Sequence, residues 1–286
     1  MIRCIASDMD GTLLTAGQEI TPETKEAIFK AQQLGVEFVV ATGRSYQEAR
    51  FVLEEAGVSC PMICVNGAEV RDADGAVVST SALGTEEARD IAARLAANGV
   101  YFELYTNKGT YTDSYAKALE IITNIVLSAN PGTEFEKAAA VAEERFRKGL
   151  IEKVGDYQEV FGDPDTKILK LLAFSLESDK LDAAKTDLEG IQDIAISSSG
   201  ADNLEITAIG AQKGLALKKF VEGKGISLQE TMALGDNYND VSMFERVGVS
   251  VAMENAPGEI KELCSRITET NEESGVAKAI VEALGL

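Results

Sequence analysis

The amino-acid sequence predicts an α/β protein whose main domain is a doubly wound parallel sheet, interrupted by a smaller α+β domain. Strand-like apolar segments at residues 2–6, 36–41 and 62–65 alternate with two amphipathic helices. This alternation is typical of a parallel sheet that is covered by helices. The same pattern returns near the C-terminus, whereas the residues between the two regions do not show this regular alternation.

The two N-terminal helices carry clear start and stop signals. The first begins at a capping residue, Thr21, and ends at Gly35. The second begins at a capping box formed by Ser45 and Glu48 and ends at Gly57. These signals separate the three strand-like segments and support their assignment to one sheet.

The C-terminal region repeats the alternation. Strands are expected at residues 231–234 and 249–253, and helices at 213–221, 239–247 and 276–284. We therefore expect both ends of the chain to build one domain, covering residues 1–83 and 209–286.

The middle of the chain, residues 84–208, predicts the inserted α+β domain. A helix is expected at residues 85–99, followed by a β-hairpin over 101–112 that turns at Asn107-Lys108-Gly109. The aromatic residues of this hairpin are interpreted as packing, and Arg145, Arg147 and Lys148 as a solvated face. Further helices are expected at about 113–130, 135–149 and 178–188, and further strands at 166–174, 194–197 and 204–207.

Composition excludes several classes of partner. Acidic residues outnumber basic ones 47 to 27, giving a net charge of −20. Such a chain repels polyanions, so we expect neither a nucleic-acid nor a membrane partner. Without a signal-peptide layout the sequence predicts a cytoplasmic protein. The cysteines are interpreted as reduced core thiols: Cys4, Cys60, Cys64 and Cys264.

The sequence contains no histidine. This excludes Ser-His-Asp and Cys-His catalysis in their usual forms, and it excludes histidine-based zinc or iron sites. A bound metal would take mainly oxygen ligands, which suits Mg²⁺. Covalent catalysis would need a nucleophile that works without an imidazole base, and an ionised carboxylate is one.

Polar clusters follow the expected strands of the main domain. They are Asp8-Met9-Asp10-Gly11-Thr12, Thr42-Gly43-Arg44, Asn66-Gly67 and the segment 235–240. Ligands bind at the carboxyl ends of parallel strands, so clusters on neighbouring strands would converge on one crevice. Carboxylates gathered there without counter-charge are costly, and a divalent cation would resolve their repulsion.

Simpler interpretations stand beside this one. Asp8–Gly11 and Asn66-Gly67 also suit ordinary polar turns, and Asp236–Asp240 could simply cap a helix. Lys213 is harder to explain structurally, because it begins a helix, where the helix dipole disfavours a positive charge. A bound anion would account for it, and the same argument applies more weakly to Arg44.

In this order, the motifs resemble those of the haloacid dehalogenase superfamily. The segment 8–14 is similar to its first motif, Thr42-Gly43-Arg44 to its second, Lys213-Gly214 to its third and the segment 235–240 to its fourth. The large insertion resembles the class IIB cap of Cof-type sugar-phosphate phosphatases. The resemblance implies a Rossmann-like core and an inserted cap that determines substrate specificity.

The resemblance also implies roles for the motif residues. Asp8 would be the nucleophile and a Mg²⁺ ligand, Asp10 the general acid and base with its backbone carbonyl on the metal, and Asp236 a further ligand. Asp240 would position Lys213. The residues expected to bind the phosphoryl group or substrate are Met9, through its backbone, Thr42, Gly43, Arg44, Asn66, Lys213 and Asn239.

These inferences predict a Mg²⁺-dependent phosphatase that hydrolyses small phosphate monoesters of metabolites, with sugar phosphates as the favoured class. Two alternatives remain open: a phosphohexomutase of the same superfamily, and a non-catalytic sensor of phosphorylated metabolites. The sequence makes no prediction of the oligomeric state.

Overall fold

The computed structural model describes residues 1–129, 132–198 and 202–286. Residue 130, the last of the helix expected at 113–130, lies outside these residues. The described part of that helix is α4 (Tyr115–Ala129).

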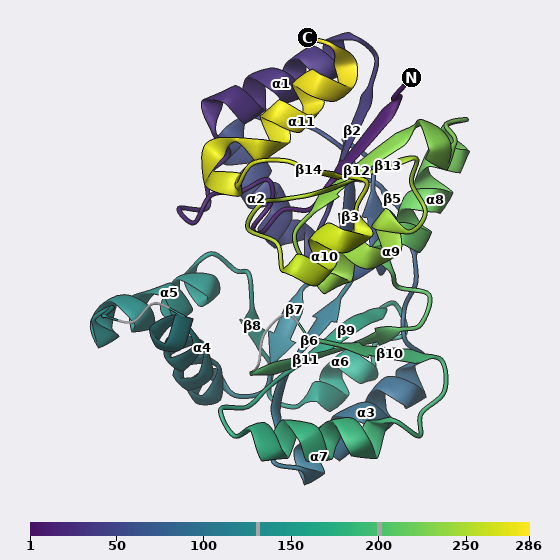
Figure 1. The fold of residues 1–286 in the computed structure, drawn as a ribbon. Coiled ribbons are helices and arrows are strands. Elements are labelled where there is room, and N and C mark those ends of the chain that lie inside the picture. Colours follow the sequence, from purple (N-terminus) through teal and green to yellow (C-terminus); the bar gives the residue numbers. More distant parts are fainter. Residues whose placement is uncertain (130–131, 199–201) are drawn as a thin grey trace. The chain divides into compact units, whose positions relative to one another are not determined.

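The chain divides into two compact units (Figure 1). One unit combines Met1–Thr80 with Gly210–Leu286, and the other is the intervening segment Ser81–Ile209. The chain therefore leaves the first unit once and returns to it once, as an inserted domain requires.

The first unit is built on an eight-stranded sheet of order β14-β13-β12-β1-β2-β3-β4-β5. The strands from β14 to β3 are parallel, and β4 and β5 are antiparallel to their neighbours. This arrangement confirms the predicted parallel-core α/β fold. The strands are β1 (Cys4–Ser7), β2 (Glu37–Ala41), β3 (Met62–Cys64), β4 (Glu69–Arg71), β5 (Val77–Thr80), β12 (Thr231–Gly235), β13 (Val249–Ala252) and β14 (Arg266–Ile267).

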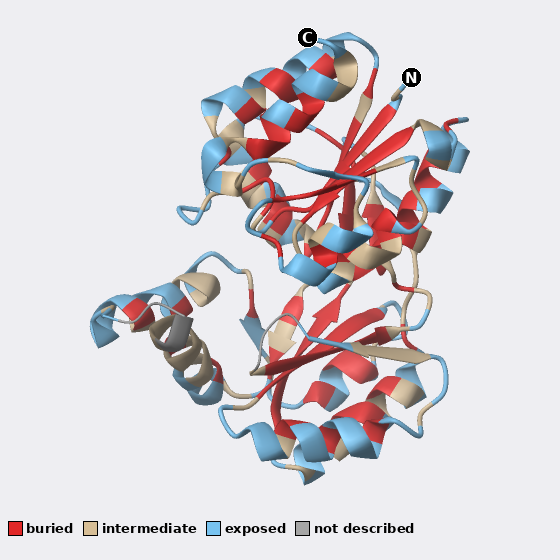
Figure 2. Ribbon diagram, in the orientation of Figure 1, coloured by how far each residue is buried: buried red, intermediate tan, exposed pale blue. Residues whose placement is uncertain are grey.

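Helices cover both faces of this sheet (Figure 1). Alternate strand residues such as Ala6, Val39 and Ile63 form one core cluster with α8, α9 and α10. On the opposite face α1 packs with α11, and α2 lies against β3. Figure 2 shows the central strands almost wholly buried. The helices are α1 (Pro22–Gln33), α2 (Tyr46–Ala56), α8 (Lys213–Gly223), α9 (Val241–Phe244), α10 (Gly258–Leu263) and α11 (Gly275–Leu284).

The predicted caps of α1 and α2 are confirmed. The Thr21 hydroxyl accepts a hydrogen bond from the Thr24 amide, and Ser45 and Glu48 form the reciprocal capping box. The strand pair β4–β5 was not predicted. The helix expected at 239–247 was wrong in extent, because it is reduced to the single turn η3 (Tyr238–Asp240) and the short α9.

The shortening of α9 follows from the backbone beyond it. The Gly248 amide donates to the Leu228 carbonyl, and a Cβ on Gly248 would lie 2.3 Å from the Gln229 carbonyl oxygen. The chain must therefore leave the helix before Gly248 to run closely past η2 (Leu228–Glu230).

The second unit is an α+β domain with a six-stranded sheet of order β10-β11-β9-β6-β7-β8. All neighbouring strands are antiparallel except β7 and β8. The predicted hairpin is β6–β7, which turns at residues 107–109. The strands are β6 (Tyr101–Thr106), β7 (Thr110–Thr112), β8 (Glu152–Lys153), β9 (Ile168–Phe174), β10 (Ile194–Ser197) and β11 (Asn203–Ala208), and the other helices are α3 (Thr85–Ala97), α5 (Phe135–Arg147), α6 (Tyr157–Phe161) and α7 (Ser178–Leu188).

Strand alternation gives this sheet two apolar faces. Phe102 and Leu104 pack in a cluster with α3 and α7, whereas Tyr101 and Tyr105 pack in a second cluster with residues of α4 and α5. The interpretation of the hairpin aromatics as packing is confirmed for these residues.

The expectation of a solvated face at Arg145 was wrong. The Arg145 guanidinium donates to both carboxylate oxygens of Glu103 at 3.0 and 2.9 Å, and Glu103 is fully buried. A buried carboxylate on β6 needs a charged partner, and α5 supplies it. Arg147, two residues later, is exposed as expected.

Cys4, Cys60 and Cys64 are free and buried, and Cys264 is free and half-buried. Within the described residues, every helix is too short or too polar to span a lipid bilayer.

Candidate active site

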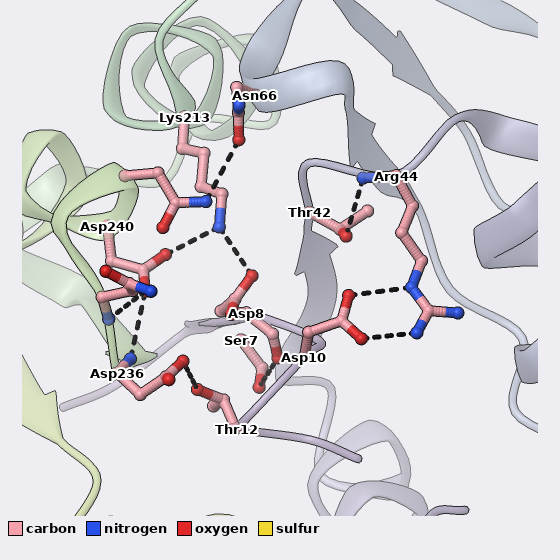
Figure 3. Close-up of polar contacts among 12 residues, drawn as sticks. Ser7, Asp8, Asp10, Thr12, Thr42, Arg44, Asn66, Lys213, Asp236 and Asp240 are labelled. Atoms are coloured by element: carbon pink, nitrogen blue, oxygen red, sulfur yellow. Dashed lines mark hydrogen bonds and ion pairs between the residues drawn. The ribbon is translucent and has the colours of Figure 1, made fainter. Parts of the chain in front are cut away.

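The candidate active site lies at the carboxyl ends of neighbouring strands of the parallel sheet. β1 lies between β12 and β2, so the residues that follow these strands come together (Figure 3). They are Asp8 after β1, Asp236 after β12 and Thr42 after β2. The Asp8 amide donates to the Leu234 carbonyl at 2.9 Å, which continues the strand pairing to the edge of the site.

Lys213 is the central cation of the site. Its ammonium lies 2.6 Å from Asp8 Oδ1 and 2.8 Å from Asp240 Oδ1, and the residue is fully buried (Figure 3). Burial opposes the charged form, but Asp240 and Asp8 outweigh this effect and raise the pKa of Lys213. Lys213 therefore stays charged across the physiological range.

Close packing of two helices brings Lys213 to this position. Lys213 begins α8, and a Cβ on the next residue, Gly214, would lie only 1.8 Å from the Ser242 carbonyl oxygen of α9. The Gly214 amide also donates to the Ser242 hydroxyl at 3.0 Å. Glycine is thus required at residue 214 if the lysine is to reach the carboxylates.

Three carboxylates surround the lysine with excess negative charge. Burial, the neighbouring Asp240 and Asp236 together raise the pKa of Asp8 well above its usual range, against the opposing effect of Lys213. Burial and Asp240 raise the pKa of Asp236 to about 6. Burial is the largest cause of both shifts, and one lysine facing three carboxylates leaves the cluster with excess negative charge.

Hydrogen bonds hold the acidic loop that follows β12, residues 236–240, in place. Asp240 Oδ2 accepts from the amides of Asp236 and Asn237, both at 3.1 Å, and the Thr12 hydroxyl donates to Asp236 Oδ1 at 3.0 Å. Gly11 has a φ of +73°, and a Cβ there would lie 2.4 Å from Asp236 Oδ2. The first motif can approach Asp236 this closely only with glycine at residue 11.

The cluster has the ligand chemistry for a divalent cation. Among the residues that the structure describes, Asp8, Asp236 and Asp240 each place one carboxylate oxygen within 4.8 Å of the others. Carboxylate oxygens and uncompensated negative charge suit Mg²⁺, which is the metal that the sequence predicts. The Asp10 side chain faces Arg44 and not this cluster (Figure 3), and the metal ligand expected from Asp10 is its backbone carbonyl.

Thr42, Gly43 and Arg44 form the loop between β2 and α2. The Thr42 hydroxyl accepts from the Arg44 amide at 3.1 Å, and Thr42 is fully buried. The Arg44 guanidinium does not turn toward Lys213: it contacts both carboxylate oxygens of Asp10 (Figure 3). The structure therefore places Arg44 beside the second aspartate of the first motif.

Asn66 and Asn239, both expected to contact substrate, lie against each other. The Asn239 amide donates to Asn66 Oδ1 at 3.2 Å. Asn66 and the preceding Val65 both have positive φ, near +50°, which is unusual for residues other than glycine. Their amides donate to the carbonyls of Thr42 and Arg44, so this strained turn also supports the β2–α2 loop.

Four further residues belong to the site: one was predicted from the sequence and three were not. Met9 is buried between the two aspartates, and its carbonyl accepts from the Leu14 amide. Thr12, Gln18 and Ser242 contact Asp236, Arg44 and Gly214 respectively, and sequence reasoning assigned them no role. Thr12 belongs to the first motif and could have been found there, whereas Gln18 and Ser242 carry no local signal.

Comparison with known proteins agrees with this geometry. The profile of the haloacid dehalogenase-like hydrolase family matches residues 5–280. The chain is 36% identical over 285 residues to the 5-amino-6-(5-phospho-D-ribitylamino)uracil phosphatase YwtE of Bacillus subtilis, covering 99% of this chain and 98% of the relative. It is 33% identical over 278 residues to the phosphatase YwpJ of the same organism, covering 96% and 98%.

A solved structure shares the whole fold. A haloacid dehalogenase-like hydrolase from B. subtilis superposes with a TM-score of 0.87 at 32% identity, covering 98% of this chain and 99% of the other. The parallel sheet, the acidic residues at its carboxyl edge and the buried lysine agree with a phosphatase of α/β fold. The chain belongs to the haloacid dehalogenase-like hydrolases and is a phosphatase of small phosphorylated metabolites within that family.

Proposed function

We propose that this phosphatase hydrolyses phosphate monoesters of sugars and sugar alcohols, with Mg²⁺, through a covalent phosphoryl intermediate on Asp8. The observation that carries the proposal is the position of Asp8: its carboxylate lies at the end of β1, 2.6 Å from a buried lysine and within the acidic cluster. The name of the relative YwtE, which specifies a phosphorylated ribityl group, supports the class of substrate.

In the first step, a carboxylate oxygen of Asp8 attacks phosphorus while the bond to the leaving oxygen breaks. Asp10 donates a proton to that oxygen, so the sugar leaves as an alcohol. Lys213 compensates charge on the transferring phosphoryl group, with Thr42, Asn239 and the backbone of Met9 and Gly43 as further donors.

In the second step, Asp10 accepts a proton from water, and the water oxygen attacks phosphorus. The bond from phosphorus to Asp8 breaks, and inorganic phosphate leaves. Asp8, Asp236 and the backbone carbonyl of Asp10 would hold Mg²⁺, whose charge would offset the negative charge of the phosphoryl oxygens. Asp240 holds Lys213 in place throughout.

The second unit, close to residues 84–208 of the sequence prediction, is proposed as the domain that selects the substrate, and the first as the catalytic core. This assignment rests on the division of the acidic site residues, all of which belong to the first unit.

A phosphate-release screen with Mg²⁺ tests the proposal. Sugar phosphates, sugar-alcohol phosphates, nucleotides, pyridoxal phosphate and p-nitrophenyl phosphate are compared by kcat/KM, with the Asp8→Asn variant as the control. We expect the first two groups to rank highest. Movement of the phosphate between substrate positions without release would instead identify a mutase, and tight binding without turnover would identify a sensor.

A further inference from the structure

The contact between Arg44 and Asp10 carries an inference about how the second aspartate is used. Arg44 Nε donates to Asp10 Oδ2 at 2.8 Å, and Nη2 donates to Asp10 Oδ1 (Figure 3). A guanidinium that meets both oxygens of a carboxylate fixes its plane as well as its position. The Asp10 side chain is 50% exposed, so packing alone does not select one orientation.

Arg44 is itself held from several directions. Its amide donates to the Thr42 hydroxyl, and its carbonyl accepts from the Val65 amide at 2.9 Å. The next residue, Ser45, is the N-cap of α2. The guanidinium also donates to Gln18 Oε1, in the loop that follows the first motif. Because the β2–α2 loop holds Arg44 in place, the guanidinium of Arg44 can fix the orientation of the Asp10 carboxylate.

We infer that Arg44 is a positioning residue, which acts on the reaction through Asp10 and is not a ligand of the phosphoryl group. The inference rests on the proposed function, in which Asp10 transfers the protons of both steps. It also revises the role that the sequence suggested for Arg44, because Nε and Nη2 of the guanidinium are turned to Asp10 and Gln18.

A double-mutant cycle separates the two roles. Arg44→Ala should lower kcat for a sugar phosphate by roughly 10- to 100-fold, the scale of loss from a misplaced catalytic group, and change KM by less than about 3-fold. In the Asp10→Asn background, the same substitution should produce no further loss. Arg44→Lys should recover little activity, since an ammonium cannot make the two-point contact.

The inhibition constant of vanadate gives a readout that does not depend on the value of kcat. A positioning role predicts an unchanged inhibition constant in Arg44→Ala, whereas Lys213→Ala should raise it. The matched control is Arg50→Ala, because Arg50 lies on α2, the helix that follows the loop of Arg44, and pairs with Glu54 at the surface of that helix. This variant should behave as wild type.

Several results would overturn the inference: additive losses in the cycle, weaker vanadate binding by Arg44→Ala, or full recovery by Arg44→Lys. Should the alanine variant fail to fold by circular dichroism, Arg44→Gln is taken through the same cycle. Failure of the proposed function is distinguished by the wild-type enzyme, which would then release no phosphate from any sugar phosphate.

Discussion

Replacing Lys213 by methionine should destabilise the protein strongly at neutral pH and much less in acid. The ammonium lies 2.6 and 2.8 Å from two buried carboxylates. At an effective dielectric constant of about 20, each of these pairs attracts by roughly 6 kcal/mol. Much of this attraction offsets the cost of burying the charges, and breaking a buried pair from one side costs about 3–5 kcal/mol. We expect a loss of that size at pH 8.

The pH dependence follows from the carboxylates that the variant leaves behind. Burial and Asp240 already raise the pKa of Asp8, and removing the lysine raises it further. A carboxyl group whose pKa is higher in the folded than in the unfolded state binds more protons when the protein is folded. The stability that this group contributes to the protein therefore falls as pH rises. At pH 5 protonation removes part of the uncompensated charge, and the loss should shrink.

Urea unfolding of wild type and Lys213→Met at pH 5 and pH 8 measures this difference. Lys218→Met, an exposed lysine of the same helix paired with Glu222, is the control and should change the free energy of unfolding by at most about 1 kcal/mol. An equal loss at both pH values, or a loss no larger than that of the control, would refute the account of Lys213 as the compensating charge.

Three further predictions concern the acidic cluster and its support. The pKa of Asp236 is raised to about 6, so the stability of the metal-free protein should fall as pH rises from about 4 through 6. Mg²⁺ should therefore raise Tm more at pH 7 than at pH 5. Equal increases in Tm would count against Asp236 as a ligand. Asp10→Asn should slow the burst with a sugar phosphate by roughly 10²–10⁴-fold, but the burst with p-nitrophenyl phosphate much less, because nitrophenolate leaves without a proton; equal losses would exclude Asp10 as the acid. Gly214→Ala should displace α8 from α9 and raise the vanadate inhibition constant, since its Cβ would lie 1.8 Å from the Ser242 oxygen, and Gly223→Ala, with open space around it, is the control.

The sequence was sufficient to predict the parallel core and the meeting of its motifs, because both depend on local signals. Caps at Thr21 and Ser45 mark where helices begin, and polar residues directly after apolar strands mark the carboxyl edge of a sheet. The contact of Lys213 with Asp8 joins residues 205 positions apart, and the family resemblance, rather than periodicity, assigned both residues to one site.

Other features depend on tertiary contacts that leave no local pattern. The sequence predicts Arg145 to be a surface residue of an amphipathic helix, and its actual position is explained only by the buried Glu103 on β6. Likewise, nothing beside Arg44 in sequence indicates that it pairs with Asp10 instead of an anion. The shortened α9 results from the close approach of Gly248 to the backbone of η2.

The central claim, that Asp8 forms a bond to phosphorus, can be tested by trapping the intermediate. Wild-type enzyme and Asp10→Asn are mixed with p-nitrophenyl phosphate and Mg²⁺, quenched in acid and digested for mass spectrometry, with Asp8→Asn as the control. We expect one phosphoryl group on Asp8, more of it in Asp10→Asn because breakdown lacks its base, and none in Asp8→Asn. A phosphoryl group on another residue, or continued turnover by Asp8→Asn, would contradict the account.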